Sequence, residues 1–105
     1  MSSIFTKIIN REIPSDIVYE QDNVIVIRDI NPRAKTHLLI IPKKEIITVD
    51  DIEKEDRDLV ADMFFVAKKV AADLGVTWAY QLHFNVWKEW WQEVMHIHMH
   101  LTSNK

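Results

Sequence analysis

The chain has 105 residues, a formal net charge of −3 and no cysteine. This length predicts one domain over residues 1–105, and a hydrophobic fraction of 48% is enough for a packed core. The acidic balance argues against a general nucleic-acid binder, which presents a basic face. The lack of cysteine fits the cytoplasm, where thiols stay reduced. We see no apolar run of a signal peptide and no stretch near the ~20 apolar residues of a membrane span.

The first half of the chain predicts a short helix followed by three strands. Apolar residues at helical spacing predict the helix, and β-branched runs predict the strands. The polar segment 21–23 is the expected turn of a hairpin, and Pro42 ends the third strand. We expect the helix over 4–10 and the strands over 17–19, 24–28 and 37–41.

The second half predicts a long helix and two more strands. Asp50 or Asp51 is the expected N-cap, and the helix ends before Gly75, where a left-handed cap belongs. Its buried stripe comprises Leu59, Val60, Met63, Phe64, Ala67, Val70, Ala71 and Leu74. We expect the last two strands over 80–85 and 94–101. This order predicts an α+β fold with a five-stranded, mostly antiparallel sheet.

Three histidines alternate along the last expected strand, at His96, His98 and His100. Alternate side chains of a strand share one face and lie roughly 6.5–7 Å apart. The pattern therefore predicts a row of three imidazoles, with apolar neighbours on the opposite face. Histidine exchanges protons near neutral pH, so the row is a candidate reactive site.

The histidine row has three interpretations. It could be the polar side of a half-buried strand. It could be a zinc site, since His-x-His is a common zinc pair and His37, His83 or Glu93 could supply a further ligand. It could also perform phosphoryl or nucleotidyl transfer, in which one imidazole attacks phosphorus and its neighbours contact the phosphate and the leaving group.

The surrounding residues resemble the histidine triad family, in particular its Hint branch of nucleoside phosphoramidate hydrolases. The segment 96–101 is similar to the triad signature itself, and nearly the whole chain follows the family pattern. The other similar segments are 4–14, 29–32, 36–44, Asn85 and 92–94. The resemblance implies the triad fold, a homodimer, a purine nucleotide such as AMP or GMP as ligand, and no metal or other cofactor.

The resemblance also implies roles for individual residues. His98 would be the nucleophile that forms a nucleotidyl intermediate, His96 and His100 would contact the phosphate and leaving group, and His37 would support the triad. The expected nucleotide-binding residues are Ile4, Phe5, Ile8, Ile27, Asp29, Ile30, Asn85, Gln92 and Glu93. Without the family pattern, the apolar residues of the first helix would be interpreted as core packing and Asp29 as a turn residue.

The loop before the triad departs from the family pattern. Family members carry glycines there, whereas this chain has one glycine in all and tryptophans at 87, 90 and 91, with Trp78 further upstream. Tryptophan disfavours the positive φ that glycine allows, and exposed indoles form apolar binding surfaces. We therefore expect an engineered variant whose four tryptophans bind a protein partner or form an oligomer interface. We also expect the tryptophan loop to reshape the phosphate pocket and to reduce the hydrolase activity, although the triad is intact. The alternative is a natural, divergent member.

Overall fold

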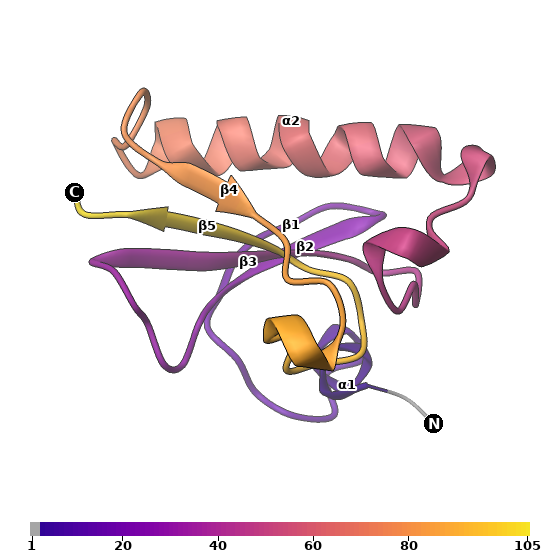
Figure 1. The fold of residues 1–105 in the computed structure, drawn as a ribbon. Helices are drawn as coiled ribbons and strands as arrows, with labels where there is room; N and C mark the ends of the chain where they lie inside the picture. The colour runs from indigo at the N-terminus through magenta and orange to yellow at the C-terminus, as the bar shows by residue number, and fades with distance from the viewer. Residues whose placement is uncertain (1–2) are drawn as a thin grey trace.

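The computed structural model describes residues 3–105, and its centre is one antiparallel sheet. The strands are β1 (Ile17–Glu20), β2 (Val24–Arg28), β3 (Thr36–Pro42), β4 (Gln81–His83) and β5 (Met99–Ser103). They pair in the order β1-β2-β3-β5-β4, so β4 and β1 form the edges (Figure 1). The expected α+β class and the five-stranded sheet are confirmed, and every neighbouring pair is antiparallel.

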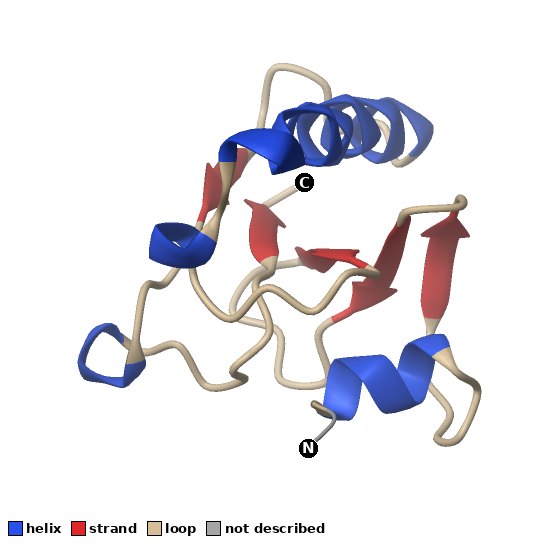
Figure 2. Cartoon of the chain, turned by 90° about the vertical axis from the view of Figure 1, so that its right-hand side faces the viewer, coloured by secondary structure: helices blue, strands red, loops and turns tan. Residues whose placement is uncertain are grey.

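Two helices cover opposite faces of the sheet. The long helix α2 (Arg57–Asp73) lies on one face and the short helix α1 (Ile4–Ile9) below the other, which gives three layers (Figures 1 and 2). Because strand side chains alternate, Met99 and Leu101 belong to the core under α2, while Leu39 belongs to the core under α1. His100 lies directly opposite Leu39 in the ladder and so points to the α1 side.

The ends of both helices follow from local sequence. Ser3 caps α1, since its side-chain oxygen accepts a hydrogen bond from the backbone N–H of Thr6 at 3.1 Å. Gly75 follows the C-cap of α2 with φ +73°, as the sequence predicted.

The predicted start of the long helix is wrong. Residues 49–56 form two 3₁₀ turns, η1 (Val49–Asp51) and η2 (Lys54–Asp56), and the α-helix begins at Arg57. Thr48 caps the first turn by accepting from Asp50 N at 3.1 Å, and Asp56 accepts from Glu53 N at 2.9 Å. These caps hold the acidic segment in separate short turns.

The last two strands are shorter than predicted. β5 begins at Met99, so His96 and His98 precede it in the chain. The reason lies at residue 97, whose N–H donates to the Ile46 carbonyl at 2.6 Å and so bonds to the segment beyond β3. β4 covers Gln81–His83, because pairing with β5 ends at His83 opposite His100.

Three of the four tryptophans have glycine-like backbone angles. Trp78, Trp87 and Trp91 have φ of 67°, 74° and 68°. The left-handed region costs an L-residue about 1–2 kcal/mol. Trp87 also has ψ 163°, a combination found almost only at glycine. The loop therefore keeps a backbone suited to glycine while carrying indoles.

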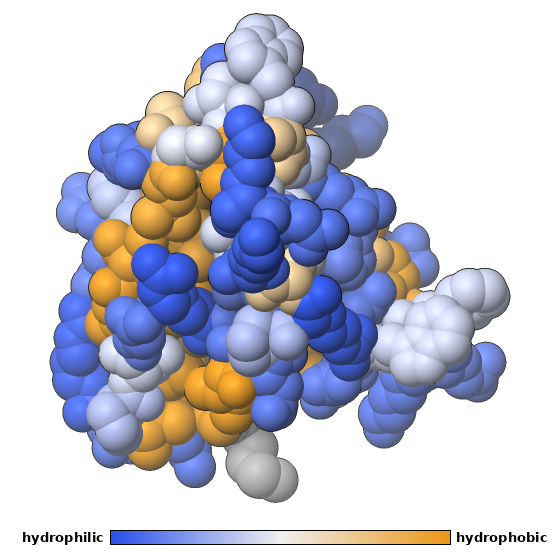
Figure 3. All heavy atoms as spheres, turned by 90° about the vertical axis from the view of Figure 1, so that its left-hand side faces the viewer, coloured by the Kyte–Doolittle hydropathy of each residue, from blue (hydrophilic) through white to orange (hydrophobic). Residues whose placement is uncertain are grey.

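Large apolar side chains reach the surface at several places. The exposed fractions of the tryptophans are 98% for Trp78, 48% for Trp87 and 66% for both Trp90 and Trp91, so the expected exposure of these side chains is confirmed. The face on the left of Figure 1 has orange apolar areas bordered by blue hydrophilic ones (Figure 3). In the described residues, no helix has the length and apolar character that a membrane crossing needs.

Candidate active site

A cavity of about 510 Å³ opens between α1, the loop after β2 and the segment that leads into β5. One part of its wall is apolar and contains all five residues expected there. The apolar lining is Ile4, Phe5, Ile8, Ile13, Pro14, Ile27, Ile30, Leu39 and Val94. The polar lining includes Asp29, Arg33, Asn85, Glu93, His98 and His100. An apolar recess beside a few polar groups is typical of a small-molecule site.

His98 presents a free ring nitrogen to this cavity. Its Nδ1 lies 2.8 Å from the backbone oxygen of His96. Because a carbonyl only accepts, Nδ1 carries the proton and Nε2 keeps its lone pair. Phe5 packs edge-on against the ring, with centroids 5.0 Å apart. His98 is therefore held as a neutral imidazole with an unprotonated Nε2.

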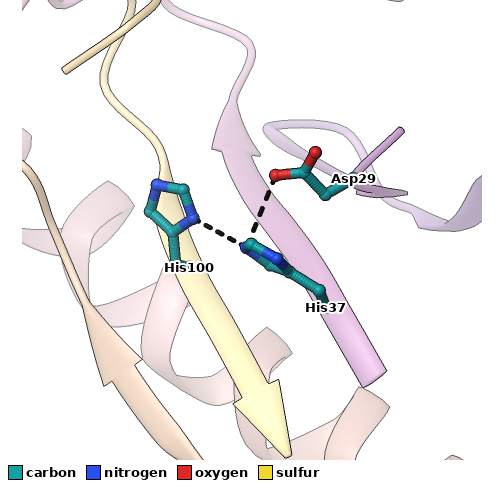
Figure 4. A group of neighbouring side chains, drawn as sticks. All are labelled: Asp29, His37 and His100. Carbon is teal, nitrogen blue, oxygen red and sulfur yellow. Dashed lines mark hydrogen bonds and ion pairs between the residues drawn. The ribbon is translucent and has the colours of Figure 1, made fainter. Parts of the chain in front are cut away.

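His100 has the opposite tautomer, set by His37. The N–H of Arg33 donates to Nδ1 of His37 at 3.1 Å, so the His37 proton is on Nε2. That N–H donates to Nδ1 of His100 at 2.9 Å, and the same nitrogen lies 3.4 Å from Oδ2 of Asp29 (Figure 4). The proton of His100 is then on Nε2, a buried atom with no hydrogen-bond partner. It is a buried donor that no group among residues 3–105 uses.

His96 does not line the cavity. It is fully buried, and both ring nitrogens have partners: Nε2 donates to the Pro42 carbonyl at 2.7 Å, and Nδ1 accepts from the Ser3 hydroxyl at 2.8 Å. The row of three rings predicted on one strand is therefore only partly correct. His98 and His100 are neighbours, with centroids 5.0 Å apart, whereas His96 connects β3 to the cap of α1.

Burial lowers the pKa of each triad histidine. Burial is the main cause at His96 and His98, so each of these rings keeps its neutral form to a lower pH than an ordinary histidine does. Burial, with the adjacent His98, His83, His37 and Arg33, lowers the pKa of His100 to about 3. A site of neutral imidazoles follows, in which one lone pair and one N–H have no partner among the described residues.

The other predicted residues divide between the cavity and its frame. Asp29 lies at the cavity, where its Oδ1 accepts from Asn31 N at 2.9 Å. Glu93 is exposed and forms an ion pair with Arg33 at 3.4 Å. Gln92 is buried outside the lining; it accepts from Trp87 N at 2.8 Å and donates to Ile47 O at 2.6 Å. Gln92 therefore holds the tryptophan loop.

Two neighbours of the site were missed by the sequence analysis. Trp91 lines the cavity beside Asn85 and Glu93, although it was expected only as an interface residue. Arg33 lines it too and fixes the tautomer of His37 through its backbone. Neither has a sequence signal beyond its position in a loop.

One group could hold a metal ion. Among residues 3–105, ligand atoms of Asp29, His37 and His100 lie within 4.8 Å of one another. This set differs from the predicted zinc row, because both nitrogens of His96 are already engaged. In the structure these three side chains satisfy one another (Figure 4).

Comparisons with known proteins place this fold and site in one group. The family model "Scavenger mRNA decapping enzyme C-term binding" matches residues 2–105. The purine nucleoside phosphoramidase of Escherichia coli K12 is 48% identical over 104 residues, which cover 98% of this chain and 87% of the relative. An uncharacterised HIT-like protein of Synechocystis is 42% identical over 98% of this chain and 90% of its own.

Solved structures of similar proteins have the same fold as this chain. A HIT family hydrolase of Legionella pneumophila superposes with TM-score 0.95 at 45% identity, covering 99% of this chain and 94% of the other. A histidine triad protein of Clostridium difficile gives 0.94 at 38% identity, covering 100% and 92%. Two histidines of the triad, His98 and His100, beside an apolar cavity define a candidate small-molecule site. The chain belongs to the histidine triad (HIT) family.

Proposed function

We propose that this chain hydrolyses purine nucleoside phosphoramidates through a nucleotidyl intermediate on His98. The observation that carries the proposal is the pair of tautomers: a lone pair on His98 Nε2 next to an unused N–H on His100 Nε2. Nucleophile and donor on adjacent rings suit attack on phosphorus with stabilisation of a phosphoryl oxygen. The 48% identical purine nucleoside phosphoramidase supports the substrate class.

The first step forms a bond between His98 Nε2 and phosphorus. As it forms, the bond from phosphorus to the leaving amine breaks, and the amine nitrogen takes a proton from solvent. The His98 ring becomes cationic, and its Nδ1–H donates to the His96 carbonyl, which stabilises that charge. His100 Nε2–H donates to a phosphoryl oxygen without transferring its proton.

The second step releases the nucleotide. Water attacks phosphorus, the bond to His98 Nε2 breaks, and its electron pair returns to that nitrogen. One proton goes to solvent, so the proton taken up in the first step is given back. The products are the free amine and a nucleoside 5′-monophosphate, and no metal enters either step.

The cavity wall suits the rest of a nucleotide. The apolar side chains from α1 and β2, including Phe5 and Ile27, offer a surface for a purine base. Asp29 lies between that surface and the histidines and offers carboxylate oxygens to the ribose hydroxyls. Asn85 and Glu93 flank the leaving group, beside Trp91.

A kinetic assay with adenosine 5′-phosphoramidate tests the proposal. We expect release of AMP, measured by phosphorus NMR or chromatography, with kcat/KM at pH 6.5 still above half its plateau value. The reason is the lowered pKa of His98, which keeps the lone pair free where an ordinary histidine is half protonated. No AMP release, or a kcat/KM already halved at pH 6.5, would contradict the proposal.

Association is a second candidate function, favoured by the exposed indoles. We propose that the chain forms a homodimer through the unpaired edge of β4 and α2, and that Trp78, Trp87, Trp90 and Trp91 bind a further protein surface. The exposed indoles at 87, 90 and 91 are the side chains expected in a loop that was redesigned to bind a protein. We expect sedimentation to show a dimer both for the wild type and for the double variant Trp90→Gly/Trp91→Gly. Only the wild type should also form species larger than the dimer. A monomer in both would contradict the dimer, and identical larger species would contradict the tryptophan surface.

A further inference from the structure

The fifth histidine, His83, lies outside the triad but touches it. It ends β4 directly opposite His100 in the β4–β5 ladder, so both side chains point to the same face of the sheet. The two imidazoles stack almost in parallel, with centroids 4.5 Å apart and planes 3° apart. The fold therefore places a flat ring against the one triad histidine that offers a free N–H.

Hydrogen bonding at its inner nitrogen does not account for a histidine at this position. Nδ1 of His83 is buried and has no partner, and leaving a polar atom in that state is unfavourable. The His83 ring therefore occupies this position even though its Nδ1 has no hydrogen-bond partner. The face-to-face contact with His100 is its closest aromatic contact.

His83 stacks on His100 at the wall of a second cavity. This cavity, of about 650 Å³, is lined by His83, His100, His37 and Arg33, among others, and by no acidic side chain. His83 lines only this cavity, whereas His100 lines both. The stacked ring thus covers a face of His100 that would otherwise meet the contents of the second cavity.

We propose that His83 is a positioning residue: its stacked ring holds the His100 imidazole at the angle that directs Nε2–H to the phosphate, and keeps water of the second cavity off the stacked face of that ring. The proposal rests on the function proposed above. The covalent bond at Cγ and the hydrogen bond from His37 at Nδ1 restrain two points of the His100 ring, and the ring can still tilt about the axis through them. The flat contact with His83 removes this freedom, while His98 closes the other side at 5.0 Å.

Three variants separate the effect of the His83–His100 stack from a general effect of substitution on the structure. His83→Ala removes the ring, and His83→Phe keeps a flat ring without nitrogen. Gln81→Ala is the matched control, because Gln81 lies on the same strand and face and lines the same cavity but pairs with Thr102. We expect kcat for adenosine phosphoramidate to fall about 10-fold in the alanine variant, with KM within about twofold, because a misplaced donor weakens only the transition state. The phenylalanine variant should regain most of kcat.

Nitrogen NMR of the histidine rings provides a readout that needs no activity. The groups facing His100 are His83, His37, His98 and Arg33. In the wild type and in His83→Phe, we expect His100 to hold its proton on Nε2 and to stay neutral throughout the weakly acidic range. In His83→Ala we expect a mixture of tautomers and protonation at higher pH, because water reaches the ring face that the stacked side chain covered.

The kinetic and NMR results for these variants each either support or overturn the positioning role of His83. The proposal is overturned if His83→Ala matches Gln81→Ala in both kcat and the His100 spectrum, or if His83→Phe loses as much as His83→Ala. If the wild type releases no AMP, the proposed function fails. The spectra still decide the positioning role in that case, since they depend on the stack and not on turnover.

Discussion

Replacing His98 by alanine is expected to lower kcat for a purine nucleoside phosphoramidate by roughly 10⁴-fold or more. The variant removes the only triad lone pair that faces the cavity beside α1, since Nδ1 of His100 accepts from His37 and both nitrogens of His96 are engaged. AMP binding should change only a few fold, because the apolar wall and Asp29 remain. Steady-state kinetics and AMP titration measure the two effects.

Chemical rescue supplies the control for this variant. His98→Gly opens a space beside Phe5, where the ring now packs at 5.0 Å. Imidazole added to the solution can occupy that space and attack phosphorus in place of the side chain. We expect hydrolysis to rise with imidazole concentration in His98→Gly and not in the wild type. Turnover of His98→Ala within tenfold of the wild type would show that His98 is not the nucleophile.

Glycine at the three tryptophans with positive φ is expected to stabilise the fold. Trp78, Trp87 and Trp91 each hold a backbone conformation that costs an L-residue about 1–2 kcal/mol. Glycine adopts it freely but adds about 0.4–1 kcal/mol of unfolded-state entropy at each site. Because Trp78 is 98% exposed, its ring contributes little packing. We expect the triple variant to gain about 2 kcal/mol in the free energy of unfolding.

Trp90 provides the matched control for that measurement. It lies in the same loop and is as exposed as Trp91, but its φ is not positive. Trp90→Gly should therefore lose about 0.5–1 kcal/mol, because glycine adds entropy without relieving strain. Denaturant unfolding of both variants gives the comparison. A triple variant no more stable than the wild type would mean that the indoles contribute packing that outweighs the strain.

Local sequence correctly predicted the elements for which only one local pattern was possible. The helix at Ile4–Ile9, the hairpin of β1 and β2, and the left-handed Gly75 each follow from one clear pattern. The start of α2 did not, because residues 50–56 hold several acidic side chains that can each cap a turn. The choice depends on tertiary partners, such as Lys44, whose ammonium pairs with Asp56 at 2.6 Å.

The candidate site was predictable in its residue types and not in its geometry. The alternation of His96, His98 and His100 identified the reactive stretch. It could not show that the ladder begins after His98, because that depends on the bond from residue 97 to Ile46 in a distant loop. The stack of His83 on His100 likewise depends on the β4–β5 register, which no local pattern encodes.

Mass spectrometry tests the nucleophilic role of His98 most directly, on protein quenched in alkaline denaturant during turnover of adenosine phosphoramidate. The quench and the digestion avoid acid, because acid hydrolyses a phosphorus–nitrogen bond to histidine. Our account predicts a covalent adduct of one adenosine monophosphate on the peptide that contains His98, formed and lost at rates consistent with kcat. The adduct should be absent in His98→Ala. Turnover without any adduct, or an adduct on another residue, would contradict the mechanism.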